Sequence, residues 1–480
     1  MGTTRRFTLV GTLAAALLLA AIACAPGSET SGPPIPSSTS VAPIPTDSPV
    51  PATPTPRPTA TVSVQVTSTG NATPGPGYIP PWTPSPLPSP TTGQPSSTAP
   101  TPTHVPPTPT IGPSTPTPLP AIVACGSGPV LTHAPMDIGT VTYISPLGAL
   151  NPPGHTFPTS HMYFMLPSEN VGGNAGPFGD GRVFPAQPVY AAADGYVSLL
   201  ASGTVTTSLS GSSTTFEEFD LRLEVCDGIV IRYGHIGPLS PRLQELLENT
   251  AASYCHSYTT GPDIVERCEY QPFWTVEPGE LLAYTSGRVA ALDFGAAIPV
   301  QVSPDRTGNE VTYSCPLDLY GDSLRLQFEA LLGDNLTRRT TEPVCGNLDV
   351  DINGTAAGRW YFDLNGPPQE DLNVAFVYDN VFTEIPVLSI GTSVSGVSSA
   401  AHQFTPVSSG SRNRTFDAIT PGAGVFCFDS LADRFGRQFP GVAILAELFD
   451  DNTLRVEKAA TNSCGTGPWT MTAAATTFTR

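Results

Sequence analysis

The sequence predicts a mainly β protein, with two β-rich domains that follow a long unstructured tether. Proline, threonine and serine dominate the chain up to about residue 120. Beyond that point, apolar and polar residues alternate in short runs, and Asp-Gly pairs stand between some of these runs. An Asp-Gly pair between two alternating runs is a strong signature of a β-hairpin. The rest of the chain is long enough for two domains, which we place at 121–304 and 305–480.

The N-terminus has the features of an export signal. Arg5 and Arg6 precede an uncharged stretch at 7–23 that is too short to span a bilayer. Such a stretch, followed by small residues, is typical of a secretory signal. The small residues lie directly before Cys24 and resemble the bacterial lipobox, although that pattern prefers Leu where Ala21 stands. The resemblance implies a signal peptide at 1–23 and a lipid on Cys24 that anchors the chain at the extracellular face of the cell membrane. Ordinary cleavage, leaving a free thiol, is the alternative.

Residues 24–120 are predicted to form a disordered tether. They contain few charges and few large apolar side chains, so they cannot bury enough apolar surface to offset their conformational entropy. Proline favours extended polyproline II, in which some 90 residues reach on the order of 280 Å at about 3.1 Å per residue. A glycosylated stalk of no specific reach is the alternative, and it implies the same location.

Apart from Cys24, the chain has eight cysteines, and an even number in an exported protein indicates disulfides. No pair has the C-x-x-C spacing of a zinc knuckle or a redox site. Eight cysteines allow about a hundred connectivities, so any pairing is a hypothesis. Proximity suggests three pairs and leaves a fourth: Cys255–Cys268, Cys315–Cys345, Cys427–Cys464 and Cys125–Cys226.

The chain is strongly acidic, with a formal charge of −19 from 40 acidic and 21 basic residues. This balance argues against nucleic acid as a partner and against passive adhesion to anionic polymers or lipid headgroups. Solubility at a cell surface is the simplest explanation.

The first domain contains the clearest strand signals. Residues 221–225 and 229–233 alternate on the two sides of Asp227-Gly228, which predicts a hairpin. Ser240-Pro241 predicts the start of a helix, because a capping residue precedes a proline at the first helical position. Leu243, Leu246 and Leu247 then follow at helical spacing. Further strands are predicted at 189–193, at 196–199 after Asp194-Gly195, and at 281–284 after a turn at 276–280.

The second domain is predicted to be a β sandwich or a barrel. It has only one histidine, His402, and nothing in it suggests a catalytic centre, so we expect a binding or packing role. The strand signals are the alternation of Leu324, Leu326 and Phe328, a run at 375–378, and a hairpin from 444–449 to 454–456.

Four stretches of the first domain resemble the lysostaphin-like zinc endopeptidases of cell walls. They occur in the order of that family and lie at 158–164, 188–197, 228–236 and 276–287. The resemblance implies an antiparallel β-sheet domain, a catalytic zinc and a peptidoglycan substrate. In place of a shorter connection in the family, some 40 residues separate His235 from Val276, an insertion that would roof the groove or alter its partner.

The resemblance carries over only part of the family's site. His161 stands at the first zinc ligand, but Met165 stands at the carboxylate ligand four residues on. The final His-x-His motif reads Ala291-Leu292-Asp293, so Asp293 stands at the last ligand. His235 stands at a catalytic histidine that does not bind the metal. His155 would complete a set of three ligands if its loop folds back.

Each of these residues also has a purely structural explanation. His161 precedes an apolar run, where a buried histidine bonded to backbone is common; Asp293 would satisfy a turn; and a turn at the neighbouring glycines would account for His235. A catalytic zinc needs three N or O ligands and a water, whose pKa the metal lowers towards 7.

Three functions therefore stand open. The leading hypothesis is a degenerate peptidase-like domain that binds cell-wall peptide or glycan, or regulates a wall hydrolase. The second is an active zinc endopeptidase with His155, His161 and Asp293 as ligands and His235 as a catalytic residue. The third is a structural or adhesive surface module. Measured metal content would distinguish the first hypothesis from the second. Affinity for the cell wall would distinguish both of them from the third.

Overall fold

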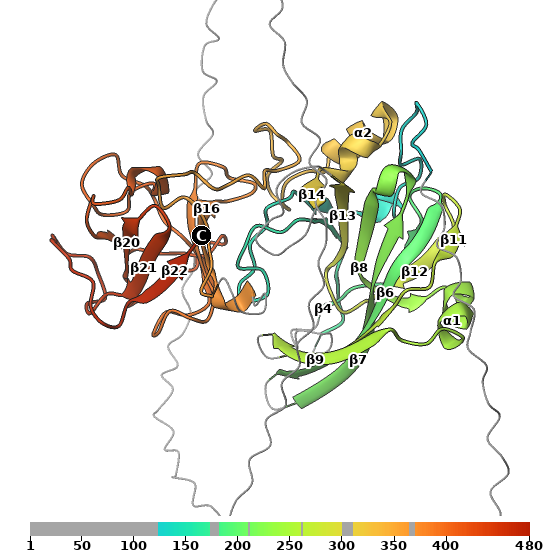
Figure 1. Cartoon of the computed structure of the whole chain (residues 1–480), viewed down its shortest axis with the longest axis horizontal. Helices are drawn as coiled ribbons and strands as arrows, with labels where there is room; N and C mark the ends of the chain where they lie inside the picture. Colours follow the sequence, from blue (N-terminus) through green and yellow to red (C-terminus); the bar gives the residue numbers. More distant parts are fainter. Residues whose placement is uncertain (1–122, 173–181, 210–211, 261–262, 300–310, 364–369) are drawn as a thin grey trace, which may run out of the picture. The chain divides into compact units, whose positions relative to one another are not determined.

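The computed structural model describes residues 123–172, 182–209, 212–260, 263–299, 311–363 and 370–480 (Figure 1). The predicted signal peptide, Cys24 and the predicted tether all lie outside the described residues. Within the described ranges the chain is mainly β and its sheets are antiparallel, which confirms the predicted fold class. No helix in these ranges combines the length and the apolarity that crossing a bilayer takes.

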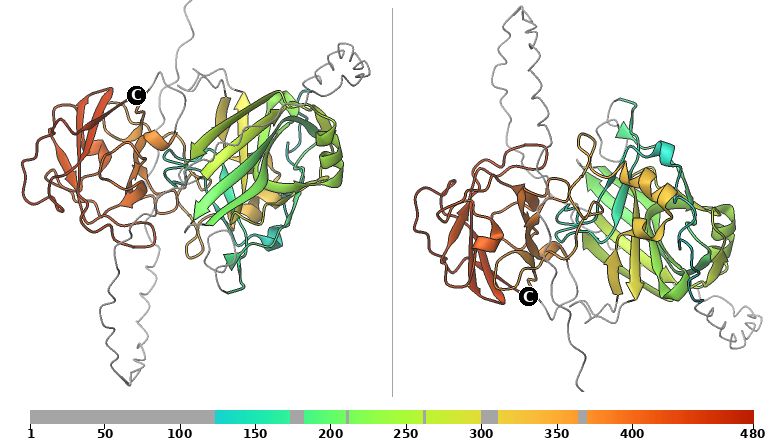
Figure 2. Two further views of the ribbon diagram at one scale, coloured as in Figure 1. Left: turned by 90° about the horizontal axis from the view of Figure 1, so that it is seen from below. Right: turned by 90° about the horizontal axis from the view of Figure 1, so that it is seen from above.

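A twelve-stranded sheet dominates the first β-rich part, and it is strongly twisted (Figures 1 and 2). Its main path runs through β1 (Tyr143–Ser145), β2 (Met162–Met165), β13 (Ala291–Pro299), β8 (Val230–Leu239), β7 (Ser212–Glu224), β6 (Gly195–Leu209), β10 (Asp263–Tyr270) and β9 (Tyr254–Thr260). The other members are β5 (Pro188–Tyr190), β11 (Trp274–Val276), β12 (Leu281–Thr285) and β14 (Val311–Ser314), and a separate pair is formed by β3 (Glu169–Asn170) and β4 (Arg182–Val183).

The predicted hairpin at Asp227-Gly228 is confirmed, because β7 pairs with β8 in antiparallel register across this turn. Asp227 has a φ of 51° and Gly228 a φ of 74°. A two-residue turn with both φ values positive suits the right-handed twist of the flanking strands, and Asp-Gly is among the pairs that adopt it most readily. The predicted strand at 189–193 is shorter in the structure, and as β5 it pairs with β12.

The predicted helix is also confirmed, as α1 (Pro241–Glu248). The Ser240 hydroxyl accepts a hydrogen bond from the backbone N–H of Leu243 at 3.3 Å, which satisfies one of the free N–H groups of the first turn. The side chain of Leu243 is fully buried against the sheet.

The strand predicted from Leu324, Leu326 and Phe328 is wrong, because these residues lie in the helix α2 (Asp322–Glu329). Leu324 and Phe328 are one helical turn apart and face the core, whereas Leu326 is 64% exposed. Arg325 forms an ion pair with Glu329 at 2.6 Å on the outer side of the helix. The apolar period is therefore four residues, and the alternation of period two is accidental.

The insertion after His235 extends the sheet. Its second half forms β9 and β10, which pair with each other and add to the edge of β6. Cys255 and Cys268 lie directly opposite each other in this hairpin.

The core of the first part extends beyond the predicted boundary at residue 304. Leu317, Phe328, Leu332 and Cys345 pack in the same apolar cluster as the large sheet, and the next cluster begins at Ala356. The first β-rich part therefore occupies residues 123–345.

The second β-rich part consists of two four-stranded antiparallel sheets, drawn in orange to red in Figure 1. Both sheets contribute side chains to one core, in which Trp360, Phe376, Phe428 and Phe478 are fully buried. The predicted strand at 375–378 and the predicted hairpin at 444–456 are confirmed. One sheet contains β15 (Gly358–Trp360), β16 (Val374–Tyr378), β17 (Pro386–Ile390) and β18 (Ala400–Gln403), and the other β19 (Phe426–Phe428), β20 (Ile444–Asp450), β21 (Thr453–Lys458) and β22 (Thr476–Thr479).

All four proposed disulfides are present. They are Cys125–Cys226, Cys255–Cys268, Cys315–Cys345 and Cys427–Cys464. The first two differ most in the loop that they close, with sequence separations of 101 and 13 residues.

We expect replacement of Cys125 and Cys226 by Ser to destabilise the first part more than the same change at Cys255 and Cys268. Chain entropy gives about 4.7 kcal/mol for a loop of the first size and about 3 kcal/mol for the second. Urea unfolding of the two double variants measures the difference. Equal losses of unfolding free energy would contradict this ranking.

Candidate functional site

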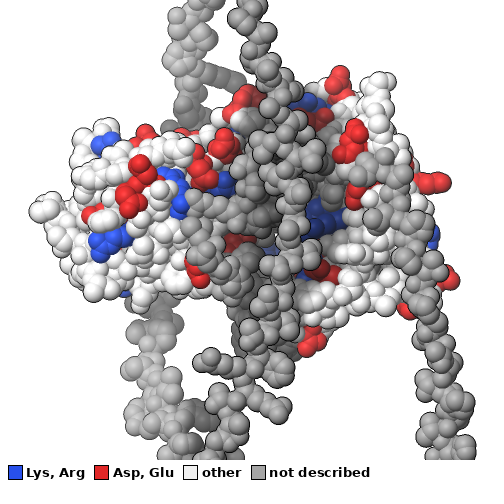
Figure 3. Space-filling view, viewed as in Figure 1, with Lys and Arg blue, Asp and Glu red and all other residues white. Residues whose placement is uncertain are grey.

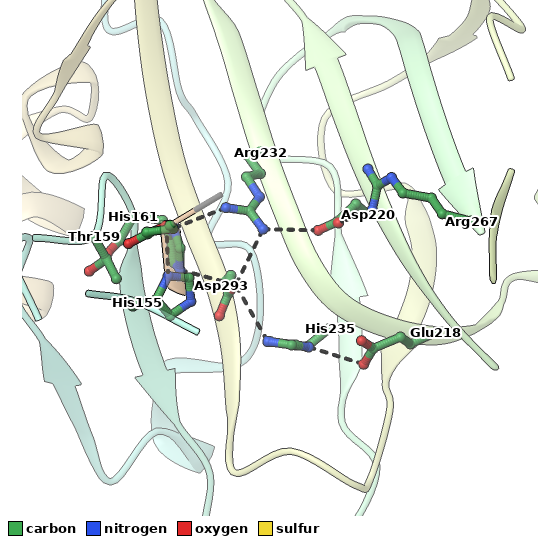
Figure 4. Close-up of polar contacts among 10 residues, drawn as sticks. His155, Thr159, His161, Glu218, Asp220, Arg232, His235, Arg267 and Asp293 are labelled. Carbon is green, nitrogen blue, oxygen red and sulfur yellow. Dashed lines mark hydrogen bonds and ion pairs between the residues drawn. The ribbon is translucent and has the colours of Figure 1, made fainter. Parts of the chain in front are cut away.

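The strand register brings three of the predicted site residues together on one face of the large sheet. Strand β13 lies between β2 and β8, so that Asp293 is directly opposite Tyr163 on one side and Gly234 on the other. His161 directly precedes β2, and His235 lies in β8. Figure 4 shows both histidines pointing towards the carboxylate of Asp293.

Asp293 and His161 are buried, with 1% and 2% of their surfaces exposed. Oδ2 of Asp293 lies 3.1 Å from Nε2 of His161 and 3.6 Å from Nε2 of His235. The contact with His161 is not aligned for a hydrogen bond, and neither that Nε2 nor Oδ1 of Asp293 has a hydrogen-bond partner among the described residues. The attraction between these groups is therefore mainly electrostatic.

His155 lies beside His161, and its Nδ1 atom is directed towards Glu370. The two rings make an edge contact, with centroids 5.3 Å apart. Nδ1 of His155 lies 3.9 Å from Oε2 of Glu370. Burial lowers the pKa of His155 to about 4, so this imidazole is neutral at pH 7.

Arg232, which the sequence did not single out, supplies the central cation of the site. Its Nη1 donates to Nδ1 of His161 at 3.0 Å, and its Nη2 lies 3.6 Å from Oδ2 of Asp293. The guanidinium thus contacts both residues that the family resemblance assigns to the metal (Figure 4). Burial opposes its charge, but the carboxylates of Asp220 and Asp293 outweigh burial and raise the pKa of Arg232.

A row of alternating charges continues from Arg232 across the sheet. Nη2 of Arg232 donates to Oδ1 of Asp220 at 3.2 Å, and the other oxygen of Asp220 accepts from Nη1 of Arg267 at 2.9 Å. Nε of Arg267 in turn donates to Glu269 at 3.4 Å. Strand β6 lies between β7 and β10 and places the small residues Ala201 and Gly203 under this contact.

A bulge in β8 turns His235 into the site. Tyr233 and Ile236 both face the core, so strict alternation is broken between them. His235 has a φ of 58°, in the left-handed region that non-glycine residues rarely adopt. A bulge of this kind re-aims a side chain without ending the strand.

His235 is held between two carboxylates. Its Nδ1 donates to Oε2 of Glu218 at 3.0 Å, and its Nε2 faces Asp293. Burial would lower its pKa, but the charges of Asp293 and Glu218 outweigh burial and raise the pKa of His235 to about 10. The imidazole is therefore protonated at neutral pH, and it has no lone pair with which to act as a general base.

Burial would raise the pKa of Asp293, but the nearby charges of His235 and Arg232, together with the contact to His161, hold it well below its usual range. The carboxylate of Asp293 can lie close to the neighbouring charged side chains because residue 234 is glycine. A Cβ at Gly234 would lie 2.8 Å from Oδ1 of Asp220 and 3.0 Å from Oδ2 of Asp293. Close approach of the two carboxylates therefore requires glycine here.

A groove of about 860 Å³ lies beside this network. Asp220, Arg232 and Arg267 form part of its lining, so the charged row faces open space. The space-filling view shows acidic and basic side chains in small groups over the face that it presents (Figure 3).

The residues do not fit a catalytic zinc. The distance of 3.1 Å between Nε2 of His161 and Oδ2 of Asp293 suits two ligands of one ion, whose bonds are about 2.0–2.1 Å long. A third ligand is lacking among the described residues, because the resemblance puts Met165 at the carboxylate position and His155 meets His161 only in an edge contact of the two rings. In the described ranges no group of three or more His, Cys, Asp or Glu side chains is arranged to hold a metal ion.

The charged row could have been anticipated in part. Glu218 and Asp220 alternate with the core residues Phe219 and Leu221 along β7, so they must share the outer face. The pairing of these charged side chains depends on the order of the strands and on the bulge in β8. Neither the strand order nor the bulge is encoded in a single segment of the sequence.

Comparison with protein-family models, curated proteins and solved structures gives no match. The resemblance to lysostaphin-like peptidases therefore rests on the sequence motifs alone.

We expect Glu218→Gln to lower the pKa of His235 from about 10 towards 6.5, because one of its two carboxylate partners loses its charge. A raised pKa contributes stability that is complete below about 6.5 and is lost as the pH rises through about 10. NMR titration of the imidazole measures the shift. Glu217→Gln, on the opposite face of β7, is the control and should leave the pKa unchanged.

We expect Gly234→Ala to lower the free energy of unfolding by about 1–3 kcal/mol, since the new methyl group must push the two carboxylates apart. The pKa of His235 should fall with the loss of Asp293 as a close neighbour. Gly203→Ala is the matched control, because a Cβ there would meet only ordinary contacts at 3.7 Å. Equal effects of the two substitutions, by urea unfolding, would refute the steric argument.

Proposed function

We propose that this protein is a cell-surface lipoprotein whose first β-rich part is a degenerate lysostaphin-like domain that binds cell-wall peptide without cleaving it. The position of Arg232 is the observation that carries the proposal. Its guanidinium contacts His161 at 3.0 Å and Asp293 at 3.6 Å, so a fixed side chain provides the positive charge that a metal ion provides in the family.

The arrangement of the matched stretches supports the lysostaphin-like fold. His161 and His235 come from two different stretches of the resemblance, and both converge on the carboxylate of Asp293, which follows the fourth stretch. For the second β-rich part, two sheets around a single core support a β sandwich.

Three features favour binding over hydrolysis. The site lacks a third zinc ligand among the described residues. His235 is protonated at neutral pH, so it cannot accept a proton from an attacking water. The groove beside the network is nonetheless open and large enough for a peptide segment, since small-ligand sites are typically about 300–1,000 Å³.

The N-terminal sequence supports the location. A lipid on Cys24 anchors the chain in the membrane, and the tether at 24–120 lets the β-rich parts reach the wall. Regulation of a wall hydrolase is compatible with the same binding activity.

One observation favours the second candidate, an active zinc endopeptidase. Nε2 of His161 and Oδ1 of Asp293 are buried without a hydrogen-bond partner, and such atoms can be satisfied by an ion. This candidate needs a third ligand, for which His155 would have to direct Nε2 towards His161 and Asp293.

The deciding experiment measures metal and wall binding on the full-length chain, purified with its disulfides formed. We expect no stoichiometric zinc by mass spectrometry, even after incubation with excess zinc, and co-sedimentation with purified peptidoglycan. His161→Ala and Asp293→Ala are the controls. One zinc per chain that both substitutions remove would overturn the proposal in favour of the endopeptidase. Absence of both zinc and wall affinity would leave the structural or adhesive module.

A further inference from the structure

Two arginines face each other across the strands that form the site. Arg222 on β7 is the direct cross-strand partner of Arg232 on β8. Both line the groove of about 860 Å³. Like charges in directly opposite positions destabilise a sheet unless a group of opposite charge lies between or beside them. Asp220 serves Arg232 in this way.

Arg222 lacks such a partner in the described part of the chain. No hydrogen bond, ion pair or ring contact of its side chain occurs there, and the residue is exposed. Arg232 and Arg267, by contrast, each donate a hydrogen bond to one oxygen of Asp220, which holds both guanidinium groups in place. The groove thus contains two oriented guanidinium groups and a third that is free to close on a ligand.

The rest of the lining fits a small anion with hydrogen-bonding groups on either side. Hydroxyl groups come from Ser160, Ser198 and Tyr313, and an amide comes from Gln271. The lining contains three arginines and two carboxylates, Asp220 and Glu224. Because Asp293 and Glu269 also contact Arg232 and Arg267, Arg222 is the lining arginine whose charge is left for a ligand. The small residues at 295–297 leave room along β13 for an extended backbone.

We propose that this groove binds the C-terminal carboxylate of a peptide, with Arg222 as the residue that closes on it. A guanidinium presents two parallel N–H donors that match the two oxygens of a carboxylate. Arg232 and Arg267 provide the fixed positive field, and the serine hydroxyls bind the adjacent peptide groups. This inference rests on the proposed function, since it names the part of the wall peptide that the domain recognises: a free chain end.

The experiment is isothermal titration of the full-length chain with N-acetyl-trialanine and with its C-terminal amide. We expect the acid to bind at least about tenfold more tightly than the amide, because a hydrogen bond to a charged group contributes about 1.5–3 kcal/mol. Arg222→Ala should abolish the preference, and Arg222→Lys should restore only part of it, because an ammonium lacks the paired donors. Arg325→Ala removes the same charge on α2, outside the groove lining, and should leave the preference intact.

Equal affinity for the acid and the amide, or no binding of either, overturns the inference. An equal loss in Arg325→Ala also overturns it, because the effect would then reflect net charge alone. Glucuronate tests the peptide assignment: binding as tight as that of the peptide acid, with the same dependence on Arg222, would mean that any carboxylate suffices. Co-sedimentation with peptidoglycan separates this inference from the proposed function. A chain that sediments with the wall but does not prefer the acid keeps its function and loses only this mode of recognition.

Discussion

The buried carboxylate of Asp293 is the constraint on which the site depends. An isolated carboxylate out of contact with water costs several kcal/mol, so it must be matched by nearby cations. His235 and Arg232 supply these charges at 3.6 Å, and each is balanced in turn by a further carboxylate. Glu218 balances His235, and Asp220 balances Arg232. The network of alternating charges therefore extends outward from Asp293 until it reaches the groove, where water and ligands can balance the remaining charge.

The backbone is adapted to this network. The left-handed conformation of His235 turns its imidazole out of the core, and the missing Cβ of Gly234 leaves room for two carboxylates on neighbouring strands. The bulge also lets Tyr233 and Ile236 both face the core, where they are fully buried. Backbone conformations that are unfavourable for L-residues persist where the surrounding structure compensates for them, and they are frequent at functional sites. Both observations favour a functional origin for the charged row.

Local signals predicted the fold where one chemical feature decides the structure. The Asp227-Gly228 turn, the Ser240 cap and three of the disulfides follow from turn geometry, capping and proximity in sequence, and the fourth disulfide joins the two cysteines that remain. Prediction failed at Leu324–Phe328, where three apolar residues fit a strand and a helix equally well and the position of the core decided between them. The site was predicted in part: His161, His235 and Asp293 converge, but Arg232 was missed because its partners come from β2, β7 and β13.

The proposal of binding rather than metal chemistry rests on the same network. A catalytic zinc needs ligands whose lone pairs are free and an open coordination position. Here Nδ1 of His161 already accepts a hydrogen bond from Arg232, and Oδ2 of Asp293 lies within 3.6 Å of three nitrogen-bearing side chains. A zinc ion entering this site would bring two further positive charges beside a guanidinium and an imidazolium, and one of these would have to move or lose its proton. A carboxylate arriving in the groove meets the opposite situation, because it adds a negative charge beside arginines already held at fixed positions.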